Sequence, residues 1–566
     1  MRISKCLFLA VLICNLAFAQ ETGLNKHISY FSSLPERISG SESCLKAANY
    51  IETSFRSCRI KKIAKEKFNV VIPVQEFASL TAGNENIPLE AVWPNSIRTS
   101  TTPLEGIVGN LIYCDDAGLK SVSGKNISGN IVVMEFNSGN LWLDIASLGA
   151  KAVIFIEPLD TSRVEAEKKF VSVPLNIPRF LLKRQYAEKI RNLAAENKQA
   201  CLTAKISWKG KDSYNIYGIL EGNDPGLKKE IIIIQGFYDA ISVVPTLAPG
   251  AESSCGISVL LELADYFAKN PPKRTVIFLA TSGHFQSMKG ISSFISQHMR
   301  GSPHVKSKLS EPIDAKFVFC LDLTSQSDEL GLWHNSYEFL YQRFLAPFAK
   351  KLIETAKKEC KKYGYNEEQS VINGVSPEKG IGWTNFLPEV IRTDGEQVVL
   401  AGYPAISFIT VNDSRRYIDT PYDTAEKIQI SNLQKQFNLI KKMISLALND
   451  PEFFSGSELN LKDRFCILTA NVVRFDPKKS FIPSEPIKDA LVLPRRQYMA
   501  GYAVPYQKSF FGVRSDIVEK TDENGEADII GCPMGSGFLL QAYSIDEYSG
   551  DIYMAPDYGA NGDEQY

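Results

Sequence analysis

Acidic and imidazole side chains follow several apolar segments of this 566-residue chain. Asp239, His284, Asp322 and Asp419 each come shortly after an apolar run or lie in a loop that connects two such runs. Carboxylates and imidazoles are zinc ligands, and they also act as general acids and bases. The four residues could in principle converge on one metal ion. A lone histidine in a pocket is more often a hydrogen-bonded polar residue than a ligand, and the other four histidines lie in none of these segments.

A nucleophile is a second interpretation of the same region. Ser253, Ser254 and Cys255 stand together before Gly256, where a helix is expected to begin. A hydrolytic serine or cysteine needs an adjacent base, and α/β-hydrolases carry their serine in a Gly-x-Ser-x-Gly turn. The sequence has neither that turn nor a nearby His-Asp order, so it does not favour a serine or thiol hydrolase. Cys255 is expected to pack against the sheet.

Apolar runs that alternate with helical segments must position these side chains. The runs are Ile231–Gln235, Thr275–Ala280, Lys316–Leu321 and Ala405–Thr410, and Gly256–Phe267 has the spacing of an amphipathic helix. Such alternation is typical of a mixed, mostly parallel sheet that is covered by helices on both faces. Ligands of these sheets bind beyond the carboxyl ends of the strands. The candidate residues are therefore expected at that edge.

Five short motifs occur in a characteristic order. They are Gln235-Gly-Phe-Tyr-Asp239, Pro249-Gly-Ala-Glu-Ser253, Ser282-Gly-His-Phe285, Leu321-Asp322 and Asp419-Thr-Pro-Tyr-Asp423. This order resembles metallopeptidase family 28, the co-catalytic zinc exopeptidases that include bacterial aminopeptidases and glutamate carboxypeptidase. The family also includes the transferrin receptor, a member that has abandoned catalysis. The resemblance implies the zinc-exopeptidase fold and, for active relatives, two zinc ions.

Most positions that the resemblance assigns to zinc ligands hold other residue types here. The first histidine ligand corresponds to Phe237, the bridging aspartate to Ser253, and the second residue of the family's Gly-Glu-Glu to Phe285. Asp322 matches a ligand, and the last histidine corresponds to Asp419. A phenyl ring has no lone pair to donate, and a neutral hydroxyl is a poor zinc ligand. We therefore expect no zinc cofactor and no metal ligands in this chain.

The catalytic base and two supporting residues complete this comparison. The glutamate that deprotonates the metal-bound water corresponds to His284, so no catalytic residue is expected. Asp239 matches the residue that orients the first histidine, which is absent here, and Asp423 is expected to stabilise a turn. We call Phe237, Asp239, Ser253, His284, Phe285, Asp322 and Asp419 the vestigial site.

The remaining segments predict three further parts. Residues 104–207 resemble the protease-associated (PA) domain that is often inserted in this family, through motifs such as Gly149-Ala-Lys-Ala-Val-Ile154. The predicted fold class is α/β: a mixed, mostly parallel sheet sandwiched by helices, an inserted α/β PA domain, and a C-terminal β-sandwich. The predicted division is a signal peptide at 1–19, the N-terminal part of the peptidase-like domain with a connector at 20–103, the insert at 104–207, the peptidase-like domain at 208–454, and the β-rich domain at 455–566.

The N-terminal part is predicted in more detail. Residues 24–60 are expected to be helical, because apolar side chains recur with helical spacing, and Phe68–Val74 is expected to form a strand. Asn84–Pro103 is rich in proline, threonine and asparagine, which favours a connector.

The first residues and the cysteines indicate export without a disulfide framework. Arg2 and Lys5 precede an apolar run that ends in Ala17-Phe18-Ala19, which predicts a signal peptide cleaved after Ala19 and a secreted or periplasmic protein. A lipid-anchored Cys14 is less favoured, because Ile13 before it is bulky. The other nine cysteines are scattered, odd in number and without a Cys-x-x-Cys pair, so free thiols are expected.

Composition excludes some partners, and two function classes stay open. The formal net charge of −1 gives no overall attraction to nucleic acid or to an anionic membrane, and no later stretch predicts a membrane span. The first hypothesis is an exported pseudo-peptidase that binds an unidentified protein or peptide, or serves in an assembly. The second is an active metal-dependent exopeptidase with an atypical site. Metal content after purification distinguishes the two hypotheses.

Overall fold

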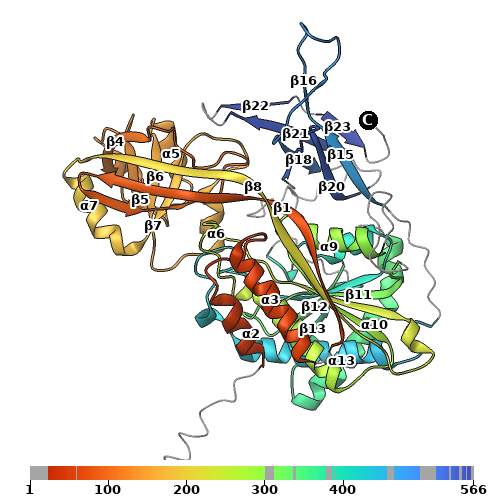
Figure 1. Ribbon diagram of the computed structural model, residues 1–566. Coiled ribbons are helices and arrows are strands. Elements are labelled where there is room, and N and C mark those ends of the chain that lie inside the picture. Colours follow the sequence, from red (N-terminus) through yellow and green to blue (C-terminus); the bar gives the residue numbers. More distant parts are fainter. Residues whose placement is uncertain are drawn as a thin grey trace, which may run out of the picture.

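The computed structural model describes residues 23–58, 60–299, 312–334, 339–377, 385–388, 391–455, 464–496, 518–533, 537–546, 551–555 and 558–561. The predicted signal peptide and its cleavage point after Ala19 lie outside these ranges. An α/β body lies at the bottom of Figure 1, an insert extends to the left, and small sheets lie at the top. Among the described residues, no helix has both the length and the apolarity needed to cross a bilayer.

A mixed, mostly parallel sheet forms the centre of the body, as the sequence predicts. Its parallel strands are, in spatial order, β14 (Ala405–Thr410), β11 (Ala315–Asp322), β9 (Ile231–Phe237) and β10 (Thr275–Thr281). β8 (Gln199–Leu220) pairs antiparallel with β10 at one side. On the other side, β12 (Leu330–Trp333) pairs antiparallel with β14, and β13 (Val371–Asn373) pairs with β12. The strands read from the sequence are confirmed.

Helices cover both faces of this sheet, so alternate side chains of each strand enter two different cores. One face carries α2 (Gly23–Ser32), α3 (Glu42–Ser57), α8 (Cys255–Lys269), α10 (Phe339–Tyr363) and α13 (Ile430–Asn449). The other carries α9 (Lys289–Phe294) and α12 (Gly395–Leu400). The predicted N-terminal helix is thus two helices, because the segment with the buried Arg37 separates them.

Gly256 lets α8 begin close to the sheet. A Cβ at this position would lie 2.7 Å from the carbonyl oxygen of Leu321 on β11, so a larger residue would push the helix away. The short helix η4 (Glu252–Ser254) directly precedes α8 and is therefore held near the carboxyl ends of the strands. This contact places Ser253 in the vestigial site.

The insert is built on strands that continue the central sheet beyond β8. β4 (Ile107–Tyr113), β5 (Ile131–Glu135), β6 (Ala152–Ile156) and β7 (Arg179–Leu182) are parallel, with α5 (Trp142–Ser147), α6 (Arg163–Ala166) and α7 (Ala187–Ala195) among the helices that follow them. A long ribbon joins the insert to the body, because β1 (Lys62–Ala82) pairs antiparallel with β8 along nearly its whole length (Figure 1). The predicted strand Phe68–Val74 is the middle of β1.

The expected connector is partly strand. β2 (Glu85–Pro88) pairs with β1, and β3 (Glu90–Ala91) pairs antiparallel with β7. These strands are short and lie in a segment that contains Pro88, Pro94 and Pro103. The segment has the composition of a loop, and only pairing with neighbouring strands makes parts of it strands.

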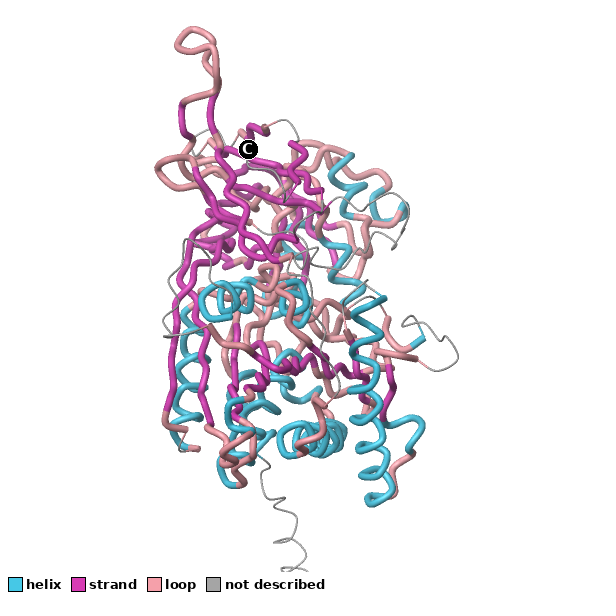
Figure 2. The backbone as a smooth tube through the Cα atoms, turned by 90° about the vertical axis from the view of Figure 1, so that its right-hand side faces the viewer, coloured by secondary structure: helices cyan, strands magenta, loops and turns pink. Residues whose placement is uncertain are grey.

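Several small β sheets follow the body. β15 (Phe465–Asn471) pairs with β20 (Glu526–Pro533), and β16 (Val473–Arg474) pairs with β17 (Glu485–Pro486). β18 (Leu491–Arg496), β19 (Glu519–Lys520), β21 (Gly537–Ile545), β22 (Ile552–Met554) and β23 (Tyr558–Asn561) form a third sheet. In Figure 2 these strands lie above the helix-rich body.

Candidate functional site: a former metal site filled by side chains

The vestigial site lies at the carboxyl edge of the central sheet, as the sequence predicts. Phe237 and Asp322 are the last residues of β9 and β11, His284 and Phe285 follow β10, and Asp419 follows β14. Each of the seven side chains is buried or nearly so. The strand ends therefore bring the predicted residues together, but their individual partners decide what they can do.

Three aromatic rings fill one half of this site, which we call the aromatic half (Phe237, His284 and Phe285). The Phe237 and His284 rings stack with centroids 3.9 Å apart and an interplanar angle of 10°. Phe285 meets both rings edge-on, at 5.8 Å from Phe237 and 4.9 Å from His284. These separations are typical of favourable aromatic pairs. Packed in this way, the two phenyl rings offer no donor atoms to a metal ion.

The His284 imidazole is bound by a buried carboxylate. Its Nδ1 lies 2.7 Å from Oδ1 of Asp394. The other oxygen of Asp394 accepts hydrogen bonds from Gln235 Nε2 at 2.5 Å and from Thr281 Oγ1 at 2.9 Å. A carboxylate only accepts, so this contact favours a proton on Nδ1. Asp394 therefore fixes the orientation and the tautomer of the ring, which leaves Nε2 as the unprotonated nitrogen.

Two arginines fill the other half, which we call the charged half (Asp322 with Arg415, and Asp419 with Arg163). Arg415 Nη1 donates to Asp322 Oδ1 at 2.8 Å, and its Nη2 lies 3.3 Å from the Asp322 carbonyl oxygen. Arg163 Nε lies 3.1 Å from Asp419 Oδ2, and the two side chains are 6% and 2% exposed. A buried carboxylate requires a cation or several donors. Guanidinium groups here supply the positive charge that metal ions supply in a zinc site.

Arg163 comes from the insert, so this ion pair also joins two parts of the chain. Three further contacts support it at the same junction. The Arg163 backbone N–H donates to the Arg416 carbonyl at 2.7 Å, Arg416 Nη2 lies 3.0 Å from Asp160 Oδ2, and the Tyr422 hydroxyl donates to the Pro158 carbonyl. The loop after β14 is thus held against the insert.

Asp239 forms hydrogen bonds with Ser39 and with backbone N–H groups rather than with an imidazole. Its Oδ2 accepts from Ser39 Oγ at 2.9 Å, and its two oxygens face the backbone N–H groups of His284 and Phe285, each at 3.4 Å. Ser39 Oγ in turn accepts from the Gly283 N–H at 2.7 Å. Burial raises the pKa of Asp239. The residue holds the turn that presents the aromatic half.

Ser253 follows Glu252, a buried acid that the sequence analysis did not identify as a site residue. Glu252 Oε2 accepts from the Ser325 N–H at 2.6 Å, and its Oε1 accepts from Ser325 Oγ at 2.7 Å and from Gln326. Burial raises the pKa of Glu252 to about 6, although the hydrogen bonds from Gln326 and Ser325 oppose this shift. Asp423 Oδ1 accepts from the Glu252 N–H at 2.7 Å, and burial raises the pKa of Asp423 to about 8.

These residues do not fit a zinc ion. His284, Asp322, Asp419 and Asp239 do not converge, because each has a different partner: Asp394, Arg415, Arg163 and Ser39 respectively. Over the described ranges, no group of three or more His, Cys, Asp or Glu side chains is arranged to hold a metal. Both arginines would repel a divalent ion.

The insert seals the edge of the sheet above the vestigial site. Phe237 and Phe285 belong to one apolar cluster with Trp93, Phe136 and Phe155, which lie in or beside the insert. The Trp93 N–H donates to the Val243 carbonyl at 2.8 Å, next to the strand ends. The rings are therefore core residues that two parts of the chain share, rather than the floor of an open cleft.

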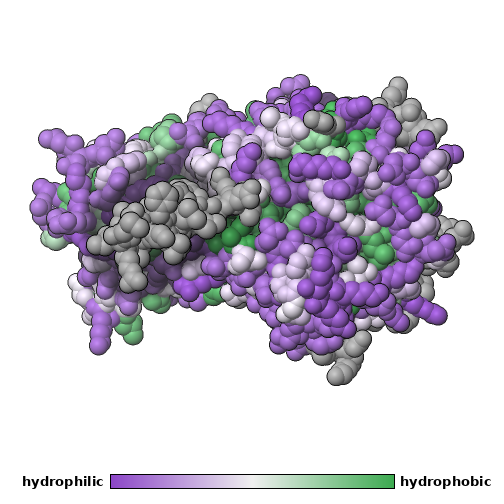
Figure 3. Space-filling model, turned by 90° about the horizontal axis from the view of Figure 1, so that it is seen from below, coloured by the Kyte–Doolittle hydropathy of each residue, from purple (hydrophilic) through white to green (hydrophobic). Residues whose placement is uncertain are grey.

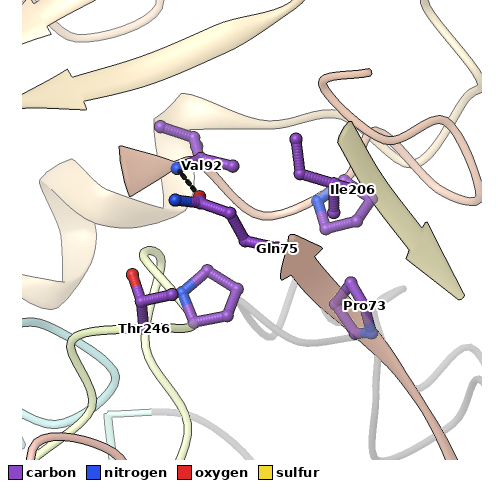
Figure 4. A pocket seen from close by; sticks show the side chains of 8 residues that line it. Pro73, Gln75, Val92, Ile206 and Thr246 are labelled. Atoms are coloured by element: carbon purple, nitrogen blue, oxygen red, sulfur yellow. Dashed lines mark hydrogen bonds between the residues drawn. The ribbon is translucent and has the colours of Figure 1, made fainter. Parts of the chain in front are cut away.

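One small hollow remains at this junction (Figure 4). It is lined by Pro73, Gln75, Ala91, Val92, Pro94, Ile206, Pro245 and Thr246. Gln75 accepts from the Ala91 N–H at 2.7 Å and donates to the Leu89 carbonyl at 3.0 Å, which leaves its amide little capacity for a ligand. The hollow has a volume of about 10 Å³, enough for about one water molecule. It is too small for an amino-acid side chain.

The sequence analysis did not identify the residues that pair with Asp322, Asp419 and His284. Arg163, Arg415 and Asp394 lie outside the five motifs. A signal did exist, because loss of two divalent ions leaves Asp322 and Asp419 without compensation, which requires cations from elsewhere in the chain. The sequence does not tell which of the 63 basic residues supply them.

Comparisons with known proteins agree with this fold. Residues 215–444 match the family described as "Peptidase family M28". "BOS complex subunit NCLN" of Canis lupus familiaris is 33% identical over 156 residues, which cover 26% of this chain and 27% of that protein. The matched segment thus spans about a quarter of the length of that relative. "Aminopeptidase YwaD" of Bacillus subtilis (strain 168) is 23% identical over 363 residues, 62% of this chain and 72% of that protein.

Two solved structures are among those similar to this chain. A structure titled "BSAP, a zinc aminopeptidase from Bacillus subtilis" is 20% identical with a TM-score of 0.48, and the match covers 75% of this chain and 95% of that one. The "gamma-secretase component Nicastrin" is 13% identical with a TM-score of 0.44, with 67% and 74% of the two chains covered.

Proposed function

Since residues 215–444 belong to peptidase family M28, we propose that this chain is a non-catalytic member whose former zinc site has become structural core. One observation carries this proposal: both acids of the charged half are paired with buried guanidinium groups. A guanidinium stays protonated in proteins, so it occupies its carboxylate at any ordinary pH. The carboxylates of Asp322 and Asp419, which a zinc ion would need as ligands, are already paired with arginines.

The absence of a base supports the same proposal independently. In this site the family's glutamate position holds His284, which is fully buried and bound to Asp394. A general base must reach the proton that it removes, directly or through one water. His284 is stacked on Phe237, meets Phe285 edge-on and is fully buried. Even a bound metal would therefore lack a partner that deprotonates its water.

Calorimetric titration with zinc, combined with a peptidase assay on aminoacyl and peptide substrates, tests the proposal. The Bacillus subtilis zinc aminopeptidase serves as the positive control in both measurements. We expect no stoichiometric zinc binding and no turnover that a chelator abolishes. One or two tightly bound zinc ions per chain with chelator-sensitive turnover would instead establish the alternative, an active metal-dependent exopeptidase with an atypical site.

We further propose a role in an assembly. The support is the sequence relationship to a protein whose name identifies it as a subunit of a complex. Because the vestigial site is sealed, the chain would bind its partner through its outer surface. The partner would be a protein or a peptide. The test is the native size of the tagged chain from its source cells: we expect elution well above the 63.0 kDa of one chain, with a partner at fixed stoichiometry. A monomer throughout would contradict this role.

Export and the division into domains are part of the same proposal. N-terminal sequencing of the secreted or compartmentalised product should begin at Gln20, after cleavage at Ala19. Residues 104–207 and 455–566 are proposed as a PA-like insert and a β-rich C-terminal domain. Because the insert shares an apolar cluster with the body, limited proteolysis should spare its junction with the vestigial site. Early cuts within Ile131–Ile156 would contradict these boundaries.

A further inference from the structure

A narrow β-hairpin projects from the C-terminal sheets. β16 and β17 pair through Val473 with Pro486 and Arg474 with Glu485, and residues 475–484 form the loop between them. This hairpin rises above the rest of the described chain in both views of the backbone (Figures 1 and 2). The loop at the end of the hairpin is therefore the part of the C-terminal region that is most accessible to a binding partner.

The end of the hairpin is apolar. Phe481, Ile482 and Phe475 are 102%, 68% and 52% exposed, and we call these three residues the apolar tip. Single exposed apolar residues are common on soluble proteins, whereas three on one protruding loop are not explained by packing. The opposite end of the molecule differs, because its surface is mainly hydrophilic with scattered apolar spots (Figure 3).

Local hydrogen bonds hold the loop in this shape. Asp476 Oδ1 accepts from the Lys478 N–H at 3.0 Å, and the Asp476 carbonyl accepts from the N–H groups of Lys479 and Ser480 at 3.0 and 3.1 Å. Ser480 Oγ accepts from the Ile482 N–H at 3.2 Å. Pro477 and Pro483 restrict the backbone further. A loop ordered in this way loses little conformational entropy when its tip binds to another surface.

Basic residues outnumber acidic ones in the hairpin segment. Residues 474–488 contain four basic side chains, Arg474, Lys478, Lys479 and Lys488, and two acidic ones, Asp476 and Glu485, a charge of +2 for this segment in a chain whose net charge is −1. Lys479 pairs with Glu485, and Lys488 pairs with Glu523 outside the segment. Lys478 is exposed and close to Phe481 in sequence. Apolar side chains with lysines around them match the boundary between acyl chains and anionic headgroups.

We propose that the apolar tip inserts into the interfacial region of a lipid bilayer that carries anionic headgroups. The size of the tip favours this occupant over a protein partner. Two phenylalanines and one isoleucine can bury on the order of 500 Å² together, below the roughly 800 Å² per partner of a stable protein interface. A bilayer surrounds a convex tip on all sides and needs no matching groove. This inference does not depend on the proposed function.

Vesicle flotation and fluorescence of the full mature chain test this proposal. The vesicles are phosphatidylcholine alone, or phosphatidylcholine with phosphatidylserine as the minor component. Phe481→Trp introduces a reporter at the tip, and we expect its emission to shift to shorter wavelength with the anionic vesicles. The double variant Phe481→Ser/Ile482→Ser should lower the bound fraction at least about tenfold, because it removes two apolar anchors. Lys478→Gln should weaken binding to the anionic vesicles only.

Leu119→Ser is the matched control, because Leu119 is 89% exposed on the insert, far from the hairpin in sequence. This variant should bind as the unchanged chain does. All variants alter exposed residues, so thermal unfolding should be unaffected and should verify that each is folded. No emission shift, equal binding by the double variant, or capture of a protein without vesicle binding would each overturn the proposal. Those outcomes would leave the proposed loss of catalysis unaffected.

Discussion

The two halves of the vestigial site are stabilised in different ways. In the aromatic half, burial of the rings against one another and against the insert is enough to stabilise them. In the charged half, Asp322 and Asp419 are buried acids, and each is paired with an arginine from a different segment. A position that becomes apolar needs only packing, whereas a buried acid needs a new cation. Four substitutions distinguish these two responses, from the largest expected effect to the smallest.

Replacing Arg415 should have the largest effect on stability. Arg415→Met keeps most of the side-chain volume but leaves Asp322 as a buried charge without its cation. We expect a loss of about 3–5 kcal/mol in the free energy of unfolding, measured by urea denaturation. The double variant Arg415→Met/Asp322→Asn removes both charges and should recover much of this loss. A single-variant loss under about 1 kcal/mol would mean that the pair is not a substitute for the metal.

Replacing Arg163 should have a smaller and more local effect. Arg163→Met removes the guanidinium group that pairs with Asp419, but separation of the insert from the loop after β14 can return that acid to water. We expect a loss of about 2–3 kcal/mol and faster amide hydrogen exchange in the segments around Pro158 and Tyr422, which contact each other at this junction. Arg416→Met is a matched control, because the Arg416 side chain is 54% exposed in its ion pair with Asp160. Equal effects from the two variants would contradict the special role of Arg163.

Glu252 is a third case, a buried acid held by neutral donors instead of an arginine. Its pKa in the folded chain is raised to about 6, above the unfolded value of about 4.3. Its contribution to stability is therefore complete below about pH 4 and is lost as the pH rises through about 6. Relative to Glu252→Gln, the unchanged chain should lose about 2 kcal/mol between pH 4 and pH 7. Parallel pH profiles of unfolding for the two chains would show that folding does not shift the pKa of Glu252.

Phe237→Leu should have the smallest effect. The substitution removes the ring that stacks on His284 but keeps an apolar side chain in the shared cluster. We expect a loss of about 1–2 kcal/mol by urea denaturation. Phe77→Leu is the control, because Phe77 is 52% exposed and its replacement should change little. A loss as large as that of Arg415→Met would show that packing and charge compensation are equally demanding.

The fold of the body could be predicted largely from local patterns, and the predictions failed where pairing decides the structure. The apolar runs at β9, β10, β11 and β14 are long enough to identify strands on their own. The stretch that contains β2 and β3 has the composition of a loop, and its strands exist only because β1 and β7 lie beside it. The break between α2 and α3 was missed for a similar reason, because buried Arg37 binds carbonyl oxygens of distant loops at Tyr238 and Gly250.

The vestigial site divides in the same way. The sequence by itself determined which donors are absent, since Phe237 and Ser253 cannot act as an imidazole and a bridging carboxylate in any fold. It also determined that the seven positions meet, because the carboxyl ends of parallel strands share one edge. Only the tertiary structure decided how the remaining acids are neutralised. Arg415 reaches Asp322 from 93 residues away, and Arg163 reaches Asp419 from α6 of the insert. A charge acts on whatever lies near it in space, so no local pattern specifies its partner.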